Sequence, residues 1–520
     1  MPKYMHRSNE FDYLEIRESE FTIHLDPNLE NCLSIKVAAR KYEDQLFFDD
    51  VAPELKDDDK AGKLRKRGTL KRLILTLPTG VQNIKCELLP HAKMDEAYNV
   101  TVSLDPPKAV LMSATNWGII RGLETISQLI FQTKTKKNNP AENDDGDNFF
   151  GIRPVEIEDA PRFTHRGLML DTARHYISLD KIIPLIDAMA YNKLNVFHWH
   201  LTDDQSFPFE SEVFPQLSKL NSFRPELTYG KSEVRMVILY AALWGIRVIP
   251  ELDTPGHSYS MRHIPNLLTE CYDTKTESKN GDFGPINPTK ATAYKAVDSL
   301  LTELNSLFVD KEFHAGGDEV DFDCWKSNPE ISRWMVDRNI SGNYEELTNY
   351  YIRRLHHILT RGHNRTMIVW QEVFDMGANL SPKNTIVHVW KDINHKHGYM
   401  AELAKVTDAG YHSILSSCWY LNYIDYGRDW QKFYECDPRG KPVKDVDKVL
   451  GGEICMWTEF VDDTNVLSRI WPRASAAAER LWSQMQASNI EEFVHRLEQH
   501  RCRLISRGID AEPVNGPGYC

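Results

Sequence analysis

The most informative stretch of the chain is Glu312-Phe-His314-Ala-Gly-Gly-Asp318-Glu319. An apolar run at Leu307–Val309 leads into it, and two glycines clear space just before two adjacent carboxylates. This pattern predicts a strand whose tip exposes both acids. Because two neighbouring carboxylates cannot both ionise cheaply, one pKa tends to rise, and that group becomes a proton donor near neutral pH. A solvated acidic loop would explain a single such pair, so the argument depends on whether the pattern recurs.

The composition is that of an ordinary globular enzyme. The 520 residues are 41% hydrophobic and 26% charged, and the length suggests a large barrel with a smaller domain, or two to four domains. No segment approaches the about 20 apolar residues of a membrane span, so no membrane span is expected. The net charge of −13 argues against nucleic acid as a partner. The basic run Lys60–Arg72 has no interleaved aromatics and is interpreted as a solvated loop.

Several features indicate the secretory route, although Met1–His6 shows no apolar core of a signal peptide. The nine cysteines show no Cys-x-x-Cys spacing, which disfavours a zinc knuckle and permits disulfides. Asn-x-Ser/Thr sequons, each a candidate glycosylation acceptor, occur at Asn99, Asn339, Asn364 and Asn379.

A polar, charged segment at Lys134–Asn148 separates two blocks of the chain. Before it, alternation at Leu73–Leu77 and Tyr98–Val102 predicts strands, and Trp117–Phe131 predicts a helix. We therefore expect an α/β domain with an antiparallel sheet over 1–150. A catalytic barrel is expected over 151–490, and a C-terminal helix with a disulfide-closed tail over 491–520.

After this segment, predicted strands and helices alternate about eight times, which is typical of a (β/α)8 barrel. Helices are expected at Ser178–Lys193, with Ser178 as N-cap, at Ser232–Trp244, which Gly245 ends, at Thr289–Phe308 and at Tyr344–Arg361. The predicted strands are Gly167–Asp171, Leu194–Leu201, Ile246–Leu252, Glu312–Ala315, Thr366–Trp370, Thr385–Trp390, His412–Ser416 and Val449–Trp457.

Each predicted strand ends in a polar, ionisable or tryptophan side chain, and in such barrels the working residues lie at these C-terminal ends. One tryptophan or histidine alone is more often structural, but eight in register are not. Carboxylates and an arginine among aromatic rings suit a pocket that stacks and hydrogen-bonds a sugar. The residues are Arg174, Asp203 with Asp204, His257, Asp318 with Glu319, Trp370, Trp390, Tyr420 with Asn422, and Trp457 with Glu459.

From about Cys32 to Cys520 the chain resembles the β-N-acetylhexosaminidases of glycoside hydrolase family 20, in particular the animal lysosomal type. The resemblance implies a retaining exo-enzyme that removes terminal β-linked GlcNAc or GalNAc, without a cofactor or a metal. It leaves open whether the substrate is a glycoprotein glycan, a chitin fragment or a glycolipid. The motifs that carry it are Gly167–Tyr176, Phe197–Asp204, Asp253–His257, His314–Glu319 and Gly451–Glu459.

The resemblance also implies the roles of the catalytic residues. Glu319 would be the general acid and base, while the substrate's own 2-acetamido oxygen attacks the anomeric carbon. Asp318 would accept the acetamido N–H, and Tyr420 would donate to the acetamido oxygen.

The remaining positions are implied to bind substrate or to support Glu319. Trp370, Trp390 and Trp457 would box the acetamido group and the ring. Arg174 and Glu459 would hold hydroxyls at the non-reducing end. Asp203 and His257 would tune Glu319 from behind, and Asn422 would read the 6-position.

The family's usual disulfides fall on Cys32–Cys86, Cys271–Cys324 and Cys502–Cys520. We hypothesise a further bridge, Cys418–Cys436, in the loop that carries Tyr420, which leaves Cys455 as a buried free thiol. Family members commonly form dimers, so a homodimer is expected, with Tyr426 able to reach the partner's site. Two departures, Tyr423 after Asn422 and the charged loop Tyr272–Asp282, do not support a preference for sulfated sugars or ganglioside turnover.

Three other functions are suggested by parts of the sequence. A family 18 chitinase is suggested by Asp318-x-x-Asp321-x-Asp323, but its final acid would be Trp325. A metal-dependent barrel hydrolase is suggested by His198-x-His200, but we expect only His257 as a further histidine ligand at later strand ends. A non-catalytic glycan-binding barrel would usually have lost the acid pair, which is intact here.

Overall fold

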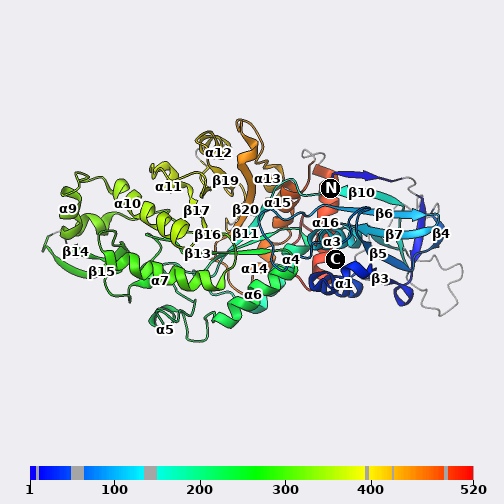
Figure 1. Cartoon of the computed structure of the whole chain (residues 1–520), viewed down its shortest axis with the longest axis horizontal. Helices are drawn as coiled ribbons and strands as arrows, with labels where there is room; N and C mark the ends of the chain where they lie inside the picture. Colours follow the sequence, from blue (N-terminus) through cyan, green and yellow to red (C-terminus); the bar gives the residue numbers. More distant parts are fainter. Residues whose placement is uncertain are drawn as a thin grey trace.

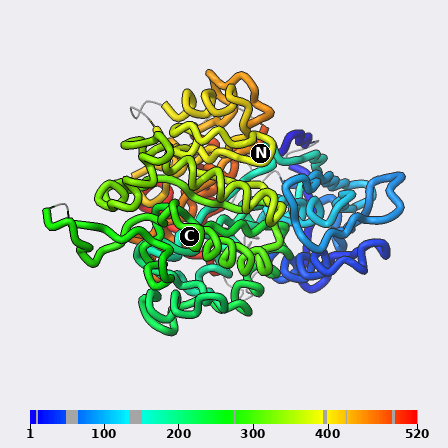
Figure 2. Tube along the Cα trace, turned by 60° about the vertical axis from the view of Figure 1, so that its left-hand side comes forward, coloured from blue at the N-terminus to red at the C-terminus, as the bar shows by residue number. Residues whose placement is uncertain are grey.

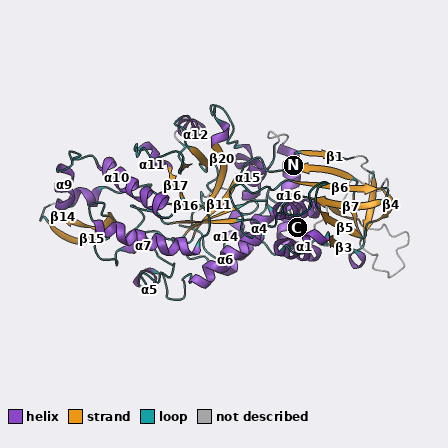
Figure 3. Cartoon of the chain, in the orientation of Figure 1, coloured by secondary structure: helices purple, strands orange, loops and turns teal. Residues whose placement is uncertain are grey.

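The computed structural model describes residues 1–7, 11–47, 64–133, 149–273, 275–392, 398–423, 425, 427–484, 490–518 and 520. Figure 1 shows an elongated molecule, with a helix-rich unit at one end and a sheet-rich unit at the other. Coloured by secondary structure, the sheets of the smaller unit stand apart from the helices that surround the larger one (Figure 3).

Within the described residues, eight parallel strands close into a barrel in chain order. They coincide with the eight predicted strands, and the predicted fold class is confirmed. A residue at the end of any of these strands therefore faces the same rim. The strands are β11 (His165–Asp171), β12 (Val196–His200), β13 (Arg247–Glu251), β16 (Glu312–His314), β17 (Thr366–Trp370), β18 (Thr385–Val389), β19 (His412–Leu415) and β20 (Val449–Met456).

The barrel interior is filled in layers. One layer is apolar and consists of Val196, Ile249, Ile368, Ile386 and Ile414. Since strand side chains alternate in direction, positions two residues further along each strand point inward again, closer to the rim. Those positions are His198, Glu251, Trp370, His388 and Ser416, all buried. The interior thus changes from aliphatic to polar over one step toward the rim.

Helices cover the outside of the barrel where they were expected. In α4, Ile182, Ile186 and Met189 form the buried stripe. Helix α6 ends at Leu243, and Gly245, which has φ +66°, follows its C-cap Trp244. Ser178 is the N-cap of α4, but its side chain makes no capping bond. The helices are α4 (Leu179–Tyr191), α5 (Gln216–Asn221), α6 (Lys231–Leu243), α7 (Ala291–Leu307), α8 (Asp323–Ser327), α9 (Pro329–Val336), α10 (Tyr344–His357), α11 (Gln371–Asp375), α12 (Tyr399–Asp408), α13 (Trp430–Glu435), α14 (Val466–Ile470) and α15 (Arg473–Trp482).

The main sheet of the N-terminal unit has the order β1-β10-β6-β7-β5-β3. The expectation of an antiparallel sheet holds for β1, β10, β6 and β7 but not for the pairs β7–β5 and β5–β3, which are parallel. Parallel neighbours need a long crossover, and α1 and β4 lie between β3 and β5 along the chain. The elements are β1 (Tyr4–His6), β2 (Asp12–Ile16), β3 (Thr22–Leu25), α1 (Leu33–Gln45), β4 (Arg65–Thr69), β5 (Arg72–Thr76), β6 (Tyr98–Leu104), β7 (Pro107–Met112), α3 (Asn116–Leu129), β8 (Ile130–Thr133), β9 (Phe149–Ile152) and β10 (Val155–Asp159).

The two units meet later in the chain than expected. Strand β10 pairs with β6 and β1, so the N-terminal unit extends to Asp159 rather than to 150. Helix α16 (Ile490–Ser506) contacts both units: Phe493 packs on Trp430, and Arg507, just after the helix, donates to Glu124 of α3 at 2.9 Å.

A two-stranded hairpin, β14 (Leu268–Asp273) with β15 (Ser278–Ile286), projects from the barrel and is conspicuous in Figure 2. Over the described parts of the chain, none of the helices combines the length and hydropathy needed to span a bilayer.

Candidate active site

The rim of the barrel brings the predicted site residues together from all eight strand ends. Trp370 is the last residue of β17, and Trp390 and Trp457 directly follow β18 and β20. Tyr420 lies in the loop after β19 and forms a bridge with Cys455 of β20. The other predicted residues follow β11, β12, β13 and β16 within a few positions.

An aromatic cluster occupies the centre of this rim. Trp370, Tyr420, Trp390 and Trp457 pack together with Met169 and Cys455. The rings of Trp370 and Trp457 are 5.9 Å apart, and those of Trp390 and Tyr420 are stacked at 6.3 Å. Trp370 is 1% exposed, whereas Trp390 and Trp457 are only partly buried. The cluster therefore has a buried floor and partly open walls, which suits a ring-shaped apolar surface.

The two carboxyl groups of the acid pair have different surroundings. Asp318 is 8% exposed, and its Oδ1 has no hydrogen-bond partner among the described residues. The Glu319 side chain is 62% exposed, and its Oε2 lies 3.8 Å from Nε2 of His257. Burial, followed by the neighbouring carboxylate of Asp253, raises the pKa of Asp318 well above its usual range. One acid of the pair is thus buried with an unpaired oxygen among the described residues, and the other is open to solvent.

The glycines before the pair are required by close approach. A Cβ at Gly316 would lie 1.6 Å from Oδ1 of Asp253, and the Gly317 N–H donates to that oxygen at 2.8 Å. Both glycines have positive φ, and so do Glu319 and His257, each at +46°. Left-handed backbone at non-glycine residues costs about 1–3 kcal/mol and is concentrated at functional sites.

A charged group behind the acid pair is centred on Asp203. Its Oδ1 accepts from Nδ1 of His257 at 3.1 Å, and its Oδ2 accepts from Nε2 of His200 at 2.8 Å. Arg174 Nη2 lies 2.9 Å from Oδ2, and Asp171 also binds Arg174, at 3.3 Å. Burial opposes ionisation of both His257 and Asp203. The carboxylates of Asp253, Asp203 and Asp318 nonetheless raise the pKa of His257, and hydrogen bonds from the histidines lower that of Asp203.

Three further polar groups lie after the ends of β17, β19 and β20. Asn422 is partly buried, and its Oδ1 makes no hydrogen bond within the described residues. Glu459 is exposed, and its charge acts on Arg174. Glu372 accepts from Nε1 of Trp390 at 2.7 Å, and burial, with the charge of Asp318, raises its pKa to about 7.

Glu372, Asp253 and Glu251 were missed at the sequence level. Each one ends or follows a barrel strand, where working residues are expected. That expectation could have identified Glu372, two residues after Trp370, and also Asp253, the first residue of the motif Asp253–His257. Burial raises the pKa of Asp253 to about 6. Glu251 points inward, which a period-two reading of β13 would have shown.

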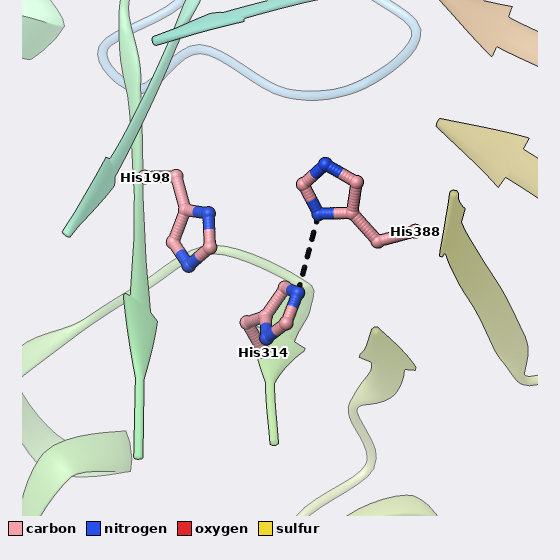
Figure 4. A group of neighbouring side chains, drawn as sticks. All are labelled: His198, His314 and His388. Carbon is pink, nitrogen blue, oxygen red and sulfur yellow. Dashed lines mark hydrogen bonds between the residues drawn. The ribbon is translucent and has the colours of Figure 1, made fainter. Parts of the chain in front are cut away.

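The expectation that His257 would be the only further histidine ligand is wrong, because His314 and His388 lie beside His198 in the barrel interior (Figure 4). His314 Nε2 and His388 Nδ1 are hydrogen-bonded at 3.3 Å. The rings of His198 and His314, however, are stacked face to face at 4.5 Å and 25°. Imidazole lone pairs lie in the ring plane, so stacked rings do not converge on one ion. The geometry favours a hydrogen-bonded stack over a tetrahedral metal site.

All nine cysteines lie in the described residues. Disulfides join Cys32–Cys86, Cys271–Cys324, Cys418–Cys436 and Cys502–Cys520, and Cys455 is free and buried. These are the pairs expected at the sequence level. The four sequon asparagines, Asn99, Asn339, Asn364 and Asn379, are all exposed.

Comparison with known proteins agrees with this geometry. Residues 163–485 match the catalytic domain of glycosyl hydrolase family 20, and residues 2–129 match the beta-acetyl hexosaminidase like domain. The chain is 40% identical over 513 residues to the mouse (Mus musculus) beta-hexosaminidase subunit beta, covering 98% of this chain and 90% of that one. It is 41% identical over 527 residues to the bovine (Bos taurus) beta-hexosaminidase subunit alpha, covering 100% and 94%.

A solved structure, the Flavobacterium johnsoniae chitobiase, superposes with a TM-score of 0.79 at 28% identity, covering 98% of this chain and 72% of that one. Family models, relatives and fold agree with the motifs from which the family was predicted. The chain therefore belongs to glycosyl hydrolase family 20 and is a glycoside hydrolase of the β-N-acetylhexosaminidase type.

Proposed function

We propose that the rim is the active site of a retaining exo-β-N-acetylhexosaminidase, which releases terminal β-linked GlcNAc or GalNAc by substrate-assisted catalysis. The observation that carries the proposal is the division of labour within the acid pair. Asp318 is buried with a free oxygen beside the aromatic cluster, and Glu319 is open to solvent. Family 20 enzymes depart from the usual two-carboxylate scheme because the substrate supplies the nucleophile.

In the first step the acetamido oxygen attacks the anomeric carbon as the glycosidic C–O bond breaks. Glu319 gives its proton to the departing oxygen, and a cyclic oxazolinium ion forms. In the second step Glu319 takes a proton from water, which attacks the anomeric carbon and reopens the ring. Two displacements on the same carbon retain the β configuration.

Asp318 and Tyr420 act on the acetamido group. Asp318 accepts its N–H, and Tyr420 donates to its oxygen. Burial makes ionisation of Asp318 costly, so this carboxylate gains most when the positive oxazolinium charge develops beside it. Tyr420 is close enough for the Asp318 charge to raise its own pKa, together with burial, and it stays a protonated donor.

The remaining residues bind the sugar or orient the acid. Trp370 forms the floor and Trp390 and Trp457 the walls of a box around the acetamido group and the sugar ring. Arg174 and Glu459 hold the non-reducing end, which limits cleavage to a terminal residue, and Asn422 reads the 6-position. Behind them, Asp203 and His257 orient Glu319.

The proposal extends to assembly and location. The relatives are named as subunits alpha and beta, which supports a dimer for this chain. Tyr426, expected to reach the partner's site, lies outside the described residues. Four disulfides and four exposed sequons support a lysosomal or secreted glycoprotein.

The test compares release of a chromophore from a 2-acetamido-β-glucoside and from the matching plain β-glucoside. Wild type should cleave only the first, and Glu319→Gln should lose about 10²–10⁴-fold in kcat. Because the Glu319 side chain is largely exposed, the free energy of unfolding of this variant should lie within about 0.5 kcal/mol of the wild-type value. Equal cleavage of both substrates would remove the acetamido group from the mechanism, and no cleavage of either would favour a glycan-binding protein.

A further inference from the structure

Glu251 is a buried carboxylate that the reaction, as described above, does not use. It is the last residue of β13, is 0% exposed, and lies in the polar inner layer of the barrel. Its strand neighbour across the sheet is His314. A buried, ionised carboxylate is retained only when donors satisfy it, so its partners indicate what it holds in place.

Each oxygen of Glu251 serves a different part of the site. Oε1 accepts from Nε1 of Trp370 at 2.8 Å and lies 2.9 Å from Nδ1 of His314. Oε2 accepts from Nδ1 of His200 at 2.6 Å and lies 3.0 Å from Nε2 of His198. The first oxygen therefore holds the floor of the aromatic cluster, and the second holds the histidine that reaches Asp203.

The path from Oε2 continues to the reacting groups. His200 donates from Nδ1 to Glu251 and from Nε2 to Asp203, and a histidine that donates from both nitrogens is an imidazolium. Asp203 in turn binds Arg174 and His257, whose Nε2 lies 3.8 Å from Glu319. Together, the carboxylates of Glu251 and Asp203 stabilise the positively charged, doubly protonated form of His200.

We propose that Glu251 is a positioning residue, which fixes the Trp370 platform and the His200–Asp203–His257 arm to one another without touching substrate. The inference rests on the proposed function, because it assigns a role relative to Glu319 as the acid. The Glu251 carboxylate then fixes the position of the Trp370 ring on which the sugar rests. It also fixes the orientation of His257 relative to Glu319. Such outlying partners are typically worth about 10–100-fold in activity.

The charged and titratable groups around Glu251 come from four strands and the loop after β13. Burial alone would raise the pKa of Glu251, but the three neighbouring histidines His314, His200 and His198 lower it well below the usual range. The groups that face this network are His198 and His200 on β12, His314 on β16, His388 on β18, Glu453 on β20, and Asp253 after β13.

Glu453 provides a matched control. It is as buried as Glu251, and it binds His198 and His165 at 2.5 and 2.8 Å, but within the described residues it makes no hydrogen bond or ion pair with Trp370 or His200. A Cβ at Gly167 would lie 2.5 Å from its Oε2, so this carboxylate is closely packed. If buried charge in the barrel were merely structural, Glu251→Gln and Glu453→Gln would have similar consequences.

The experiment measures kcat, KM and the pH dependence of kcat/KM for wild type, Glu251→Gln and Glu453→Gln with the chromogenic 2-acetamido-β-glucoside. Thermal unfolding is recorded on the same samples. We expect Glu251→Gln to lose 10–100-fold in kcat/KM, shared between kcat and KM, and to shift the basic limb of the pH profile. Glu453→Gln should keep the wild-type pH profile and lose less than about 5-fold per folded molecule.

Folded Glu251→Gln with wild-type kcat, KM and pH profile would overturn the inference, and so would an equal shift of the profile in Glu453→Gln. If Glu251→Gln does not fold, Trp370→Phe tests the same coupling, because it keeps a ring and removes the N–H that Glu251 accepts. A shifted basic limb in Trp370→Phe supports the coupling, and an unchanged limb overturns it. Failure of this inference can be distinguished from failure of the proposed function. In the second case, wild type itself does not discriminate between the two glucosides.

Discussion

Asp203→Asn is the substitution whose consequences follow most directly from the contacts. The carboxylate of Asp203 is buried and accepts from His200 at 2.8 Å, from His257 at 3.1 Å and from the backbone N–H of Asp204 at 2.7 Å. Arg174 Nη2 lies at 2.9 Å. Asparagine keeps the volume but offers one acceptor oxygen and an NH2 group, which would face donors.

The magnitude follows from this count of donors. Breaking a buried ion pair on one side costs about 3–5 kcal/mol, because the partner charge stays buried. At about 2.1 cal/mol/K of unfolding entropy per residue, 520 residues give roughly 1.1 kcal/mol/K, and the melting temperature should fall by about 3–5 °C. Activity should fall by about 10–100-fold in kcat/KM, since His257 loses its orienting partner. Arg174 keeps Asp171 at 3.3 Å, so KM should change less than kcat.

The assay is thermal unfolding together with kcat, KM and the pH profile on the chromogenic 2-acetamido-β-glucoside. Asp204→Asn is the matched control. It makes the same chemical change one residue later, where Asp204 accepts a single backbone N–H from Tyr259 at 2.8 Å. The reasoning is refuted if Asp203→Asn melts within 1 °C of wild type and keeps its pH profile, or if Asp204→Asn has the same effect.

Two further predictions follow. Gly316→Ala should abolish activity and lower the yield of folded protein, because its Cβ would overlap Oδ1 of Asp253 and its φ is +65°. A soluble variant with wild-type kcat would contradict this. The contribution of Asp253 and Glu372 to the free energy of unfolding should fall as pH rises from about 5 to about 7.5, because burial raises the pKa of Asp253 to about 6 and that of Glu372 to about 7. In the folded chain these two groups hold protons that the unfolded chain releases, so their contribution is greatest below the unfolded pKa values. Denaturant unfolding of wild type and Glu372→Gln at a series of pH values would measure it: wild type should lose stability relative to Glu372→Gln as pH rises, and a relative gain would disprove it.

Local patterns in the sequence were sufficient for the barrel and for most of its rim. Strand positions such as Thr366–Trp370 were predicted because apolar runs, helix stripes and terminal glycines are properties of neighbouring residues. Since parallel strands in a closed barrel share one rim, knowing where each strand ends was enough to collect Trp370, Trp390 and Trp457 in one place. The motifs around Asp318 then indicated the family.

Local sequence patterns were thus enough to predict the order of the elements and the residues of the rim. Long-range packing was needed to show that Asp253 faces Asp318 across 65 positions of chain, that Glu251 joins Trp370 to His200, and that the N-terminal sheet is mixed and runs to Asp159. The physical reason is that strand pairing and burial bring distant side chains together. A carboxylate's partners, and hence its pKa, belong to those contacts rather than to its neighbours along the chain.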